Sequence, residues 1–273
     1  MGVRRASPIA ALLAGLGGPI AHAQDRFEIQ VYDGTADEPG AAGLELHLND
    51  WLTGRRDRHP PEAALHGQFH ATLEPSLGIL PFWEIGAYVQ FAARTDDGVF
   101  DWAGVKARSK WVTPPHWDRH ARLGLNLEVS YVPSTYDMNR WGMELRPIVA
   151  WQNSDWLFAL NPILEQALAS PGAASGPLLS PALKVARSVG PVALGFEYFA
   201  SIGPLASPMP LRAQDHEVFE VVDVTSWERF ELNLGVGEGL TPASAGITVK
   251  AIFGVELETS TIPAPLQASK LGR

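Results

Sequence analysis

The chain has 273 residues, with 21 Lys+Arg against 30 Asp+Glu and a formal net charge of −9. This acidic balance, without any basic stripe, excludes nucleic acid as an expected partner. Cysteine is absent, which excludes a disulfide framework and thiol catalysis. Hydrophobic residues make up 46% of the chain, beside 26 Gly, 22 Pro and 9 Trp, and this composition favours strands and turns over helices.

The N-terminus has the features of a secretory signal peptide. Arg4 and Arg5 form a short basic region, residues 9–20 are apolar and small, and Ala-His-Ala at 21–23 is an A-x-A cleavage site. The apolar run is short and broken by Gly and Pro, which disfavours a membrane-anchor helix. We predict cleavage after Ala23. The mature chain then carries 19 positive and 30 negative residues, a net charge of −11.

Apolar and polar residues alternate along most of the mature chain. Phe69, Ala71 and Leu73, for example, alternate with His70 and Thr72. A period of two predicts β-strands with one apolar and one polar face. Most of the stretches have the roughly nine to eleven residues that a tilted strand needs to cross a bilayer. The predicted strands are 44–52, 65–77, 82–94, 102–112, 121–131, 141–152, 155–165, 179–188, 191–202, 216–226, 229–237 and 245–257.

The connections between these strands alternate in length. Short ones at 78–81, 153–154, 189–190 and 227–228, with a medium one at 113–120, alternate with longer polar ones. The longer set is 53–64, 95–101, 132–140, 166–178, 203–215 and 238–244. Short periplasmic turns opposite longer outer loops, with an even number of strands, are typical of outer-membrane barrels. Counted from the strand at 44–52, this arrangement puts both termini in the periplasm.

Aromatic residues end the apolar faces, as two interfacial girdles require. These are Trp83, Phe91, Trp102, Trp111, Tyr131, Trp141, Trp151 and Trp156. The alternative is a soluble β protein in which such rings fill the corners of the core. We predict an all-β transmembrane antiparallel β-barrel of about 12 strands. The predicted domains are a signal peptide at 1–23, a periplasmic N-terminal segment at 24–43, the barrel at 44–258 and a C-terminal tail at 259–273.

Three pieces of the chain resemble a known family. FEIQVYDG…PG…LELHLN, FHATLEPSLGI and FWEIGAYVQ are similar to porin-like outer-membrane proteins grouped as transporters of phenol-degradation pathways. The resemblance implies a barrel of about this size that passes small organic solutes. The chain departs from a typical outer-membrane barrel, which ends on an aromatic residue, because Leu257 is followed by a tail. The departure concerns the signal read by the outer-membrane assembly machinery, which is an expected partner.

The polar faces should line the lumen of the barrel. Twelve strands about 4.8 Å apart and tilted by about 40° close into a cylinder roughly 24 Å across. The predicted lumen-lining residues are His47, His70, Glu74, Glu84, Gln90, Lys106, Arg108, Glu128, Glu144 and Arg146. Symmetric hairpins would set His47 opposite His70 and Asn49 opposite Gln68, with a register good to about two residues. Because both signs are interleaved, we expect a paired network instead of a field of one sign.

One part of the predicted wall is smooth. The inward positions of the strands at 155–165, 179–188 and 191–202 include Ala159, Ala182, Ala186, Ala193, Gly195 and Ser201. This leaves room for a solute or for an inserted segment, and the candidate insert is residues 27–33. We prefer the periplasmic side for these residues, because Glu28 and Gln30 would need partners inside the barrel. Four strand prolines, Pro75, Pro147, Pro162 and Pro181, predict bulges or nearer strand ends.

Catalysis and cofactors are not expected. No His is followed two residues later by Ser, so the pattern lacks a serine hydrolase arrangement. His47 and His70 with Glu45 and Glu74 resemble a loose metal constellation, but neutral His in a hydrogen-bonded lumen is the preferred interpretation.

Loop 53–64 carries Arg55, Arg56, Arg58 and His59. These residues either bind phosphate of lipopolysaccharide or form a solvated charge run. The predicted function is a Gram-negative outer-membrane channel for passive passage of small solutes, including organic ones. The alternative is a closed structural or surface-interaction barrel without transport, and a membrane-embedded hydrolase ranks third.

Overall fold

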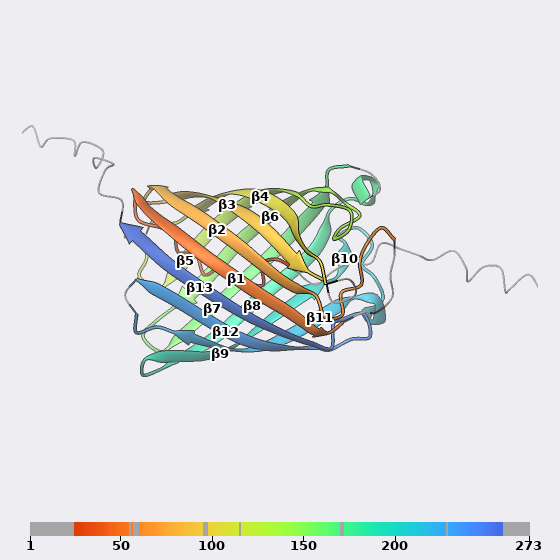
Figure 1. Cartoon of the computed structure of the whole chain (residues 1–273). Helices are drawn as coiled ribbons and strands as arrows, with labels where there is room; N and C mark the ends of the chain where they lie inside the picture. Colours follow the sequence, from red (N-terminus) through yellow and green to blue (C-terminus); the bar gives the residue numbers. More distant parts are fainter. Residues whose placement is uncertain are drawn as a thin grey trace, which may run out of the picture.

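The computed structural model describes residues 25–258 apart from 55, 57–59, 95–97, 115, 170–171 and 228. Twelve long strands close into one antiparallel barrel (Figure 1). They are β1 (Ala41–Thr53), β2 (Phe69–Leu80), β3 (Trp83–Ala93), β4 (Phe100–Val112), β5 (Ala121–Tyr131), β6 (Trp141–Gln152), β7 (Trp156–Ala167), β8 (Leu178–Val189), β9 (Val192–Ser201), β11 (Asp215–Val224), β12 (Phe230–Gly239) and β13 (Ile247–Glu258). A two-residue strand, β10 (Gly203–Pro204), adds to β8 in the loop after β9.

Closure joins the first long strand to the last. β1 pairs with β13, with Leu44 opposite Val255. All other pairings between long strands join strands that follow one another in the sequence. β9 pairs with β11, because only the short strand β10 lies between them in the chain. A closed sheet leaves no edge of unpaired backbone groups. In the described part of the chain, no helix is long and apolar enough to cross a membrane.

All twelve predicted strands are confirmed, and the largest change in bounds has a local cause. β2 begins at Phe69 instead of residue 65, because residues 65–68 form a turn in which the Gln68 backbone amide donates to the Leu65 carbonyl at 3.1 Å. Leu65 is buried, the Gln68 side-chain amide donates to the Ala64 carbonyl at 2.6 Å, and the Trp51 amide donates to the Gln68 carbonyl at 3.0 Å.

The outer surface of the barrel is apolar. Its exposed strand side chains include Leu73, Val89, Leu125, Val129, Leu160, Phe196, Leu234 and Phe253. Aromatic rings gather at both ends of this surface. Tyr131 contacts Trp102 and Trp141, with ring centroids 5.8 and 4.9 Å away, at the long-loop end. Phe158 contacts Trp151 and Trp156, at 5.8 and 5.9 Å, at the short-turn end. The two predicted aromatic belts are therefore present.

The strand prolines do not create the expected bulges. Pro162 lies opposite Pro181 in regular register, and Leu125 lies opposite Pro147. The register shifts fall elsewhere, between Gln90 and Phe91 for example. The prolines instead interrupt the ladder without changing its register: the β6–β7 pairing skips from Leu145–Leu164 to Val149–Leu160, around Pro147 and Pro162, which lack an amide hydrogen to donate.

Candidate functional site: a filled lumen with an acidic cavity

Residues 25–40 run through the inside of the barrel. The Lys250 ammonium on β13 donates to the Ile29 carbonyl at 2.8 Å. The side chain of Asn161 on β7 accepts from the Tyr32 amide at 2.7 Å and donates to the Tyr32 carbonyl at 2.9 Å. The segment therefore touches walls on different sides of the lumen, and its backbone groups are satisfied by strand side chains. We call residues 25–40 the lumen segment.

The lumen segment is also matched to the wall by charge. The Glu28 carboxylate lies 3.3 Å from the Lys106 ammonium and 3.5 Å from the Arg146 guanidinium, and it accepts a hydrogen bond from the Tyr32 hydroxyl at 2.7 Å. Asp33 pairs with Arg122 on β5 at 3.1 Å. The wall partners Lys106, Arg146 and Arg122 come from β4, β6 and β5, so the segment is held at several points along its length.

The preferred periplasmic position for residues 27–33 is therefore wrong, and the inserted alternative is correct. The objection to insertion was that Glu28 and Gln30 would need partners inside the barrel. Both have them, because the Gln30 amide also donates to Glu45 at 3.4 Å and the Gln30 carbonyl accepts from Arg146 at 3.3 Å. Arg26 donates to the Tyr136 carbonyl in the loop at 132–140, so the segment begins at the long-loop end of the barrel and not at the short-turn end.

The smooth wall is what accommodates the segment. Ala159, Ala182, Ala186, Ala193 and Ser201 are all buried, as the strand phase predicts. Ile29 and Val31 of the lumen segment belong to one buried apolar cluster that includes Ala159, Ala182, Trp51, Phe199 and Phe219. Small wall residues leave the volume that the segment fills, and its apolar side chains pack the long-loop half of the lumen.

The ten residues predicted to line the lumen lie on the inner face of the barrel. Nine are buried: His47, His70, Glu74, Glu84, Gln90, Lys106, Arg108, Glu128 and Arg146. Glu144 is half-buried and accepts a hydrogen bond from Arg146 at 2.6 Å. Arg108 donates to Glu74 at 2.6 Å and contacts Glu84 at 2.6 Å. A role of these residues in solute passage stays a prediction.

The predicted hairpin registers are off by two residues. His47 lies opposite Thr72, and Asn49 lies opposite His70. The two histidines therefore have separate surroundings. His70 stacks on Phe27 at 4.4 Å between ring centroids and bonds to the Arg26 carbonyl at 3.0 Å. The His47 ring instead faces the carboxylates of Glu45 and Glu74, both at 3.1 Å.

A second buried ion network lies on the opposite wall. Lys184 on β8 contacts Glu197 on β9 at 3.1 Å and Asp223 on β11 at 2.9 Å, and Lys250 also pairs with Glu197. These residues are not among those predicted from the sequence to line the lumen. Lys184 shares the inward phase of Ala182 and Ala186, so the alternation that identified the smooth wall also contained this signal.

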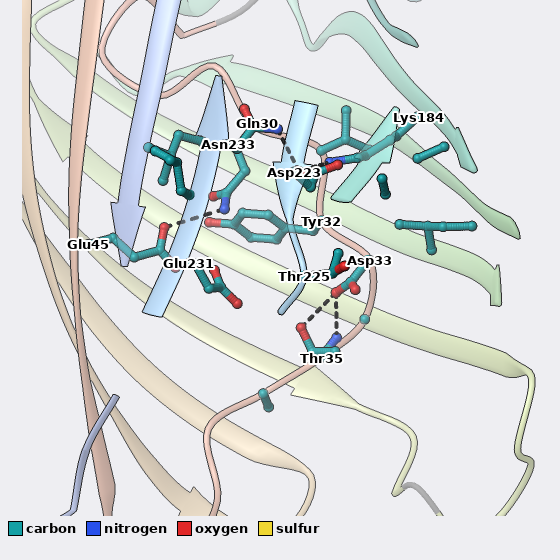
Figure 2. Close-up of a pocket in the computed structure, with 18 of the residues that line it drawn as sticks. Gln30, Tyr32, Asp33, Thr35, Glu45, Lys184, Asp223, Thr225, Glu231 and Asn233 are labelled. Carbon is teal, nitrogen blue, oxygen red and sulfur yellow. Dashed lines mark hydrogen bonds and ion pairs between the residues drawn. The ribbon is translucent and has the colours of Figure 1, made fainter. Parts of the chain in front are cut away.

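An open cavity occupies the short-turn half of the lumen (Figure 2). It has a volume of about 620 Å³, and residues 30–38 of the lumen segment form one side of it. Its rim includes Thr225 and Trp227, which are exposed. At the same end, Ser76 donates to Asp37 at 2.5 Å. Burial nevertheless raises the pKa of the Asp37 carboxyl above its ordinary value, because the charged form loses water.

The charge lining the cavity is predominantly negative. Three basic residues, Arg108, Lys110 and Lys184, face ten acidic ones. The acidic residues are Asp33, Asp37, Glu38, Glu45, Glu74, Glu84, Glu197, Asp223, Glu231 and Glu256. The expected paired network extends to the cavity, because Glu74, Glu84, Asp33, Glu197 and Asp223 each pair with an arginine or lysine, but acidic residues remain in excess there. The excess of carboxylates arises because three of them, Asp33, Asp37 and Glu38, come from the lumen segment, which the predicted pairing of the strands leaves out.

Part of loop 53–64 lies in the described region. Arg56 is exposed, whereas Arg55, Arg58 and His59 lie outside the described residues. A contact of this loop with lipopolysaccharide therefore stays a prediction.

Comparison with known proteins finds only distant structural similarity. The chain matches no protein-family model and none of the curated proteins. Among solved structures, it is similar to the KdgM porin in complex with disordered oligogalacturonate, with 11% identity, a TM-score of 0.47, and coverage of 80% of this chain and 99% of that one. The chain is also similar to the TodX monoaromatic hydrocarbon channel, with 10% identity, a TM-score of 0.42, and coverage of 83% of this chain and 92% of that one.

The outer membrane phospholipase A from Escherichia coli gives 12% identity, a TM-score of 0.41, and coverage of 91% of this chain and 96% of that one. The similar structures thus include both channels and an enzyme. Likenesses of this size carry no argument about function, and both the resemblance to phenol-degradation transporters and the expectation of no enzyme activity stay predictions. The chain is a closed twelve-stranded antiparallel β-barrel.

Proposed function

We propose that this chain spans the bacterial outer membrane and is a channel for small solutes, with the lumen segment as its internal plug. The apolar outer surface and its two aromatic belts support the membrane location, since such a surface is stable in lipid and unfavourable in water. Strands of 10–13 residues are long enough to cross the hydrocarbon core at the usual tilt.

The acidic cavity is the observation that carries the functional proposal. A cavity of about 620 Å³ can hold a small organic molecule. Its excess of carboxylates, enclosed by low-dielectric walls, produces a negative potential that attracts cations and repels anions. Positively charged small solutes, including organic ones, are therefore the proposed class.

Passage through the whole barrel requires the lumen segment to move. Ile29 and Val31 pack with Trp51, Phe199 and Phe219 in the long-loop half, and a solute must displace this apolar contact. The channel is therefore gated: the plugged state is the one described, and the conducting state has the segment withdrawn or shifted.

Planar-bilayer recording of the purified protein tests this proposal. We expect unitary current steps and a reversal potential that indicates preference for cations, larger at low salt where screening is weak. Glu231→Gln, in the cavity, should reduce this preference. Glu238→Gln is the matched control, because Glu238 lies on the outward-facing phase of the same strand β12. Anion preference, or equal effects of both variants, would contradict the cationic class.

The closed barrel without transport is the second candidate, and the pairing of the lumen segment favours it. The segment's Glu28, Tyr32 and Asp33 all have partners in the wall, as expected of a permanently packed core. A silent bilayer record from protein that shifts its gel mobility on boiling, as intact barrels do, would support this candidate over the channel.

A further inference from the structure

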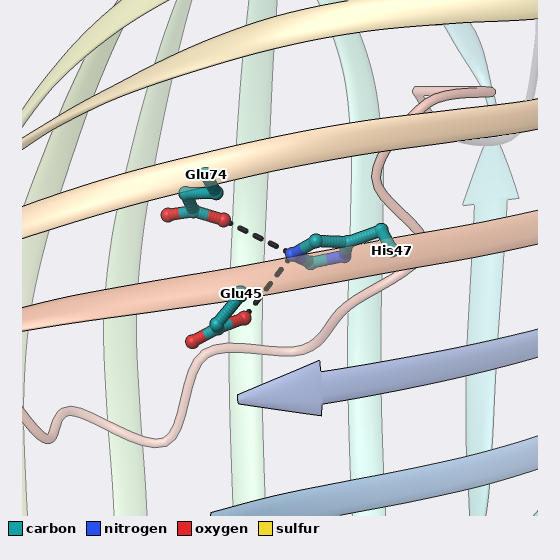
Figure 3. A group of neighbouring side chains, drawn as sticks. All are labelled: Glu45, His47 and Glu74. Carbon is teal, nitrogen blue, oxygen red and sulfur yellow. Dashed lines mark hydrogen bonds and ion pairs between the residues drawn. The ribbon is translucent and has the colours of Figure 1, made fainter. Parts of the chain in front are cut away.

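We propose that Glu45, His47 and Glu74 form a binding site for a divalent transition-metal ion of the zinc type, inside the barrel and beside the cavity. The three residues come from two neighbouring strands. Glu45 and His47 are two residues apart on β1, so their side chains share a face, and Glu45 lies directly opposite Glu74 of β2 in the ladder. Figure 3 shows both carboxylates pointing at one ring nitrogen of His47.

The distances suit a metal site. His47 Nε2 lies 3.1 Å from Glu45 Oε2 and 3.1 Å from Glu74 Oε2, and the three possible ligand atoms all lie within 4.8 Å of one another. Zinc bonds of about 2.0–2.1 Å in a tetrahedron separate neighbouring ligand atoms by about 3.3 Å. The distances from His47 Nε2 to the two carboxylate oxygens therefore need to change by only a few tenths of an ångström. The distance between the two carboxylate oxygens is adjusted by turning one carboxylate.

The present contacts leave a chemical requirement that a cation would meet. Two carboxylates directly opposite each other on one sheet face repel. The Nε2 atom between them can carry one proton, which cannot point at both oxygens. The second proton of an imidazolium would sit on Nδ1, which is buried and has no hydrogen-bond partner among the described atoms. An ion coordinated by Nε2 and both oxygens satisfies all three ligand atoms and removes the repulsion.

The surroundings also fit. Arg108 donates to the other oxygen of Glu74, Oε1, at 2.6 Å, which fixes the direction of Oε2, as outer hydrogen bonds do in metal sites. Glu45 and Glu74 both line the acidic cavity. Solvent or a solute can therefore reach the fourth coordination position from the cavity. An imidazole nitrogen with two carboxylates favours Zn²⁺ and related ions over Mg²⁺ and Ca²⁺, which prefer oxygen ligands.

Isothermal titration of the folded, chelator-treated full chain in detergent with ZnCl₂ tests the site without any transport measurement. We expect one Zn²⁺ per chain, and no comparable binding of MgCl₂. His47→Gln should weaken Zn²⁺ binding by roughly 100-fold or more, since even outer-shell changes cost about 10–100-fold. His70→Gln is the matched control, because His70 is equally buried on the neighbouring strand and lies outside the cluster.

Glu45→Gln is the second variant, for the case in which His47→Gln does not fold. Glu45 is only half-buried, so its substitution should preserve the fold. This variant should weaken Zn²⁺ binding to a similar extent. Heat-modifiable gel mobility identifies the folded variants. Absence of Zn²⁺ binding by the parent chain, or binding that the folded cluster variants retain, would overturn the site. Neither result depends on conductance, so the metal site and the channel can fail separately.

Discussion

Glu28 on the lumen segment and Lys106 on β4 form an ion pair inside the barrel, with 3.3 Å between Oε2 and Nζ, although they are 78 residues apart in the chain. Lys106 also pairs with Asp25 and, at 3.0 Å, with Glu128. Two of the three carboxylates around this lysine, Asp25 and Glu28, therefore come from the lumen segment, and one comes from the wall. The pair couples the position of the segment to the charge pattern of the barrel.

Replacing Glu28 with Gln should loosen the lumen segment. The change leaves Lys106 and Arg146 with one partner fewer in a buried site, and we expect a loss of about 3 kcal/mol in the free energy of unfolding, within the range measured for broken buried pairs. Denaturant unfolding in detergent, with tryptophan fluorescence, measures this loss. In bilayers the same variant should open more often if the chain is a channel.

Glu38→Gln is the matched control for this variant. Glu38 lies on the same segment but is exposed, so its substitution should change neither quantity measurably. If both substitutions have the same effect, the buried ion pair does not hold the segment.

Gly78→Ala should disturb the point where the lumen segment leaves the barrel. A Cβ on Gly78 would overlap the carbonyl oxygens of Asp37 and Glu38, which are backbone atoms and cannot rotate away. We expect a destabilisation of about 1–3 kcal/mol, as for other overpacked sites, measured by thermal unfolding. Gly142→Ala is the comparison, because the nearest atom to its Cβ is the rotatable Ser130 hydroxyl at 2.9 Å. Equal melting temperatures for the two variants would contradict this account.

The stability of the barrel should depend on the protonation of Asp137 in the loop at 132–140. Burial raises the pKa of Asp137 to about 6, and the nearby carboxylates of Glu62 and Asp25 add to the increase. An unfolded aspartate has a pKa of about 3.9. Between these values the folded state binds more protons than the unfolded state, so the contribution of Asp137 to stability falls as the pH rises through about 6.

Asp137→Asn should remove this part of the pH dependence. The variant should be more stable than the parent chain at pH above about 7 and show a smaller difference in melting temperature between acidic and neutral buffer. Asparagine retains an oxygen that can accept the hydrogen bond from the Asn139 amide, which is 2.7 Å long in the parent chain. An unchanged pH profile would show that Asp137 ionises in the same way in both states.

The orientation of the barrel predicts which connections a protease can reach. A cleavage site inserted between β1 and β2, or between β10 and β11, should be cut on intact cells. A site inserted at the turn between β6 and β7 should be cut only after the outer membrane is opened, because short turns face the periplasm. Cleavage in the reverse pattern would place the acidic cavity at the cell surface.

The sequence by itself determined the strands and their faces. The face of the sheet on which a side chain lies depends only on its position along its own strand and not on which strands lie beside it. For this reason all twelve strands, the aromatic belts and the inward phase of residues such as Lys106 and Glu128 could be predicted. The inward Ala159 and Ala182 were predicted on the same grounds, together with the space that they leave.

Only the tertiary structure decided what fills that space. The lumen segment has no repeating pattern, and its stability depends on partners such as Asn161, Arg146 and Lys250 that are remote in the chain. Pairing register is equally non-local: a shift of two residues preserves every inward phase but changes every partner. That shift separates His47 from His70 and brings Glu45 opposite Glu74. The sequence could supply the three residues of the cluster, but only the register of the β1–β2 pairing brings them together.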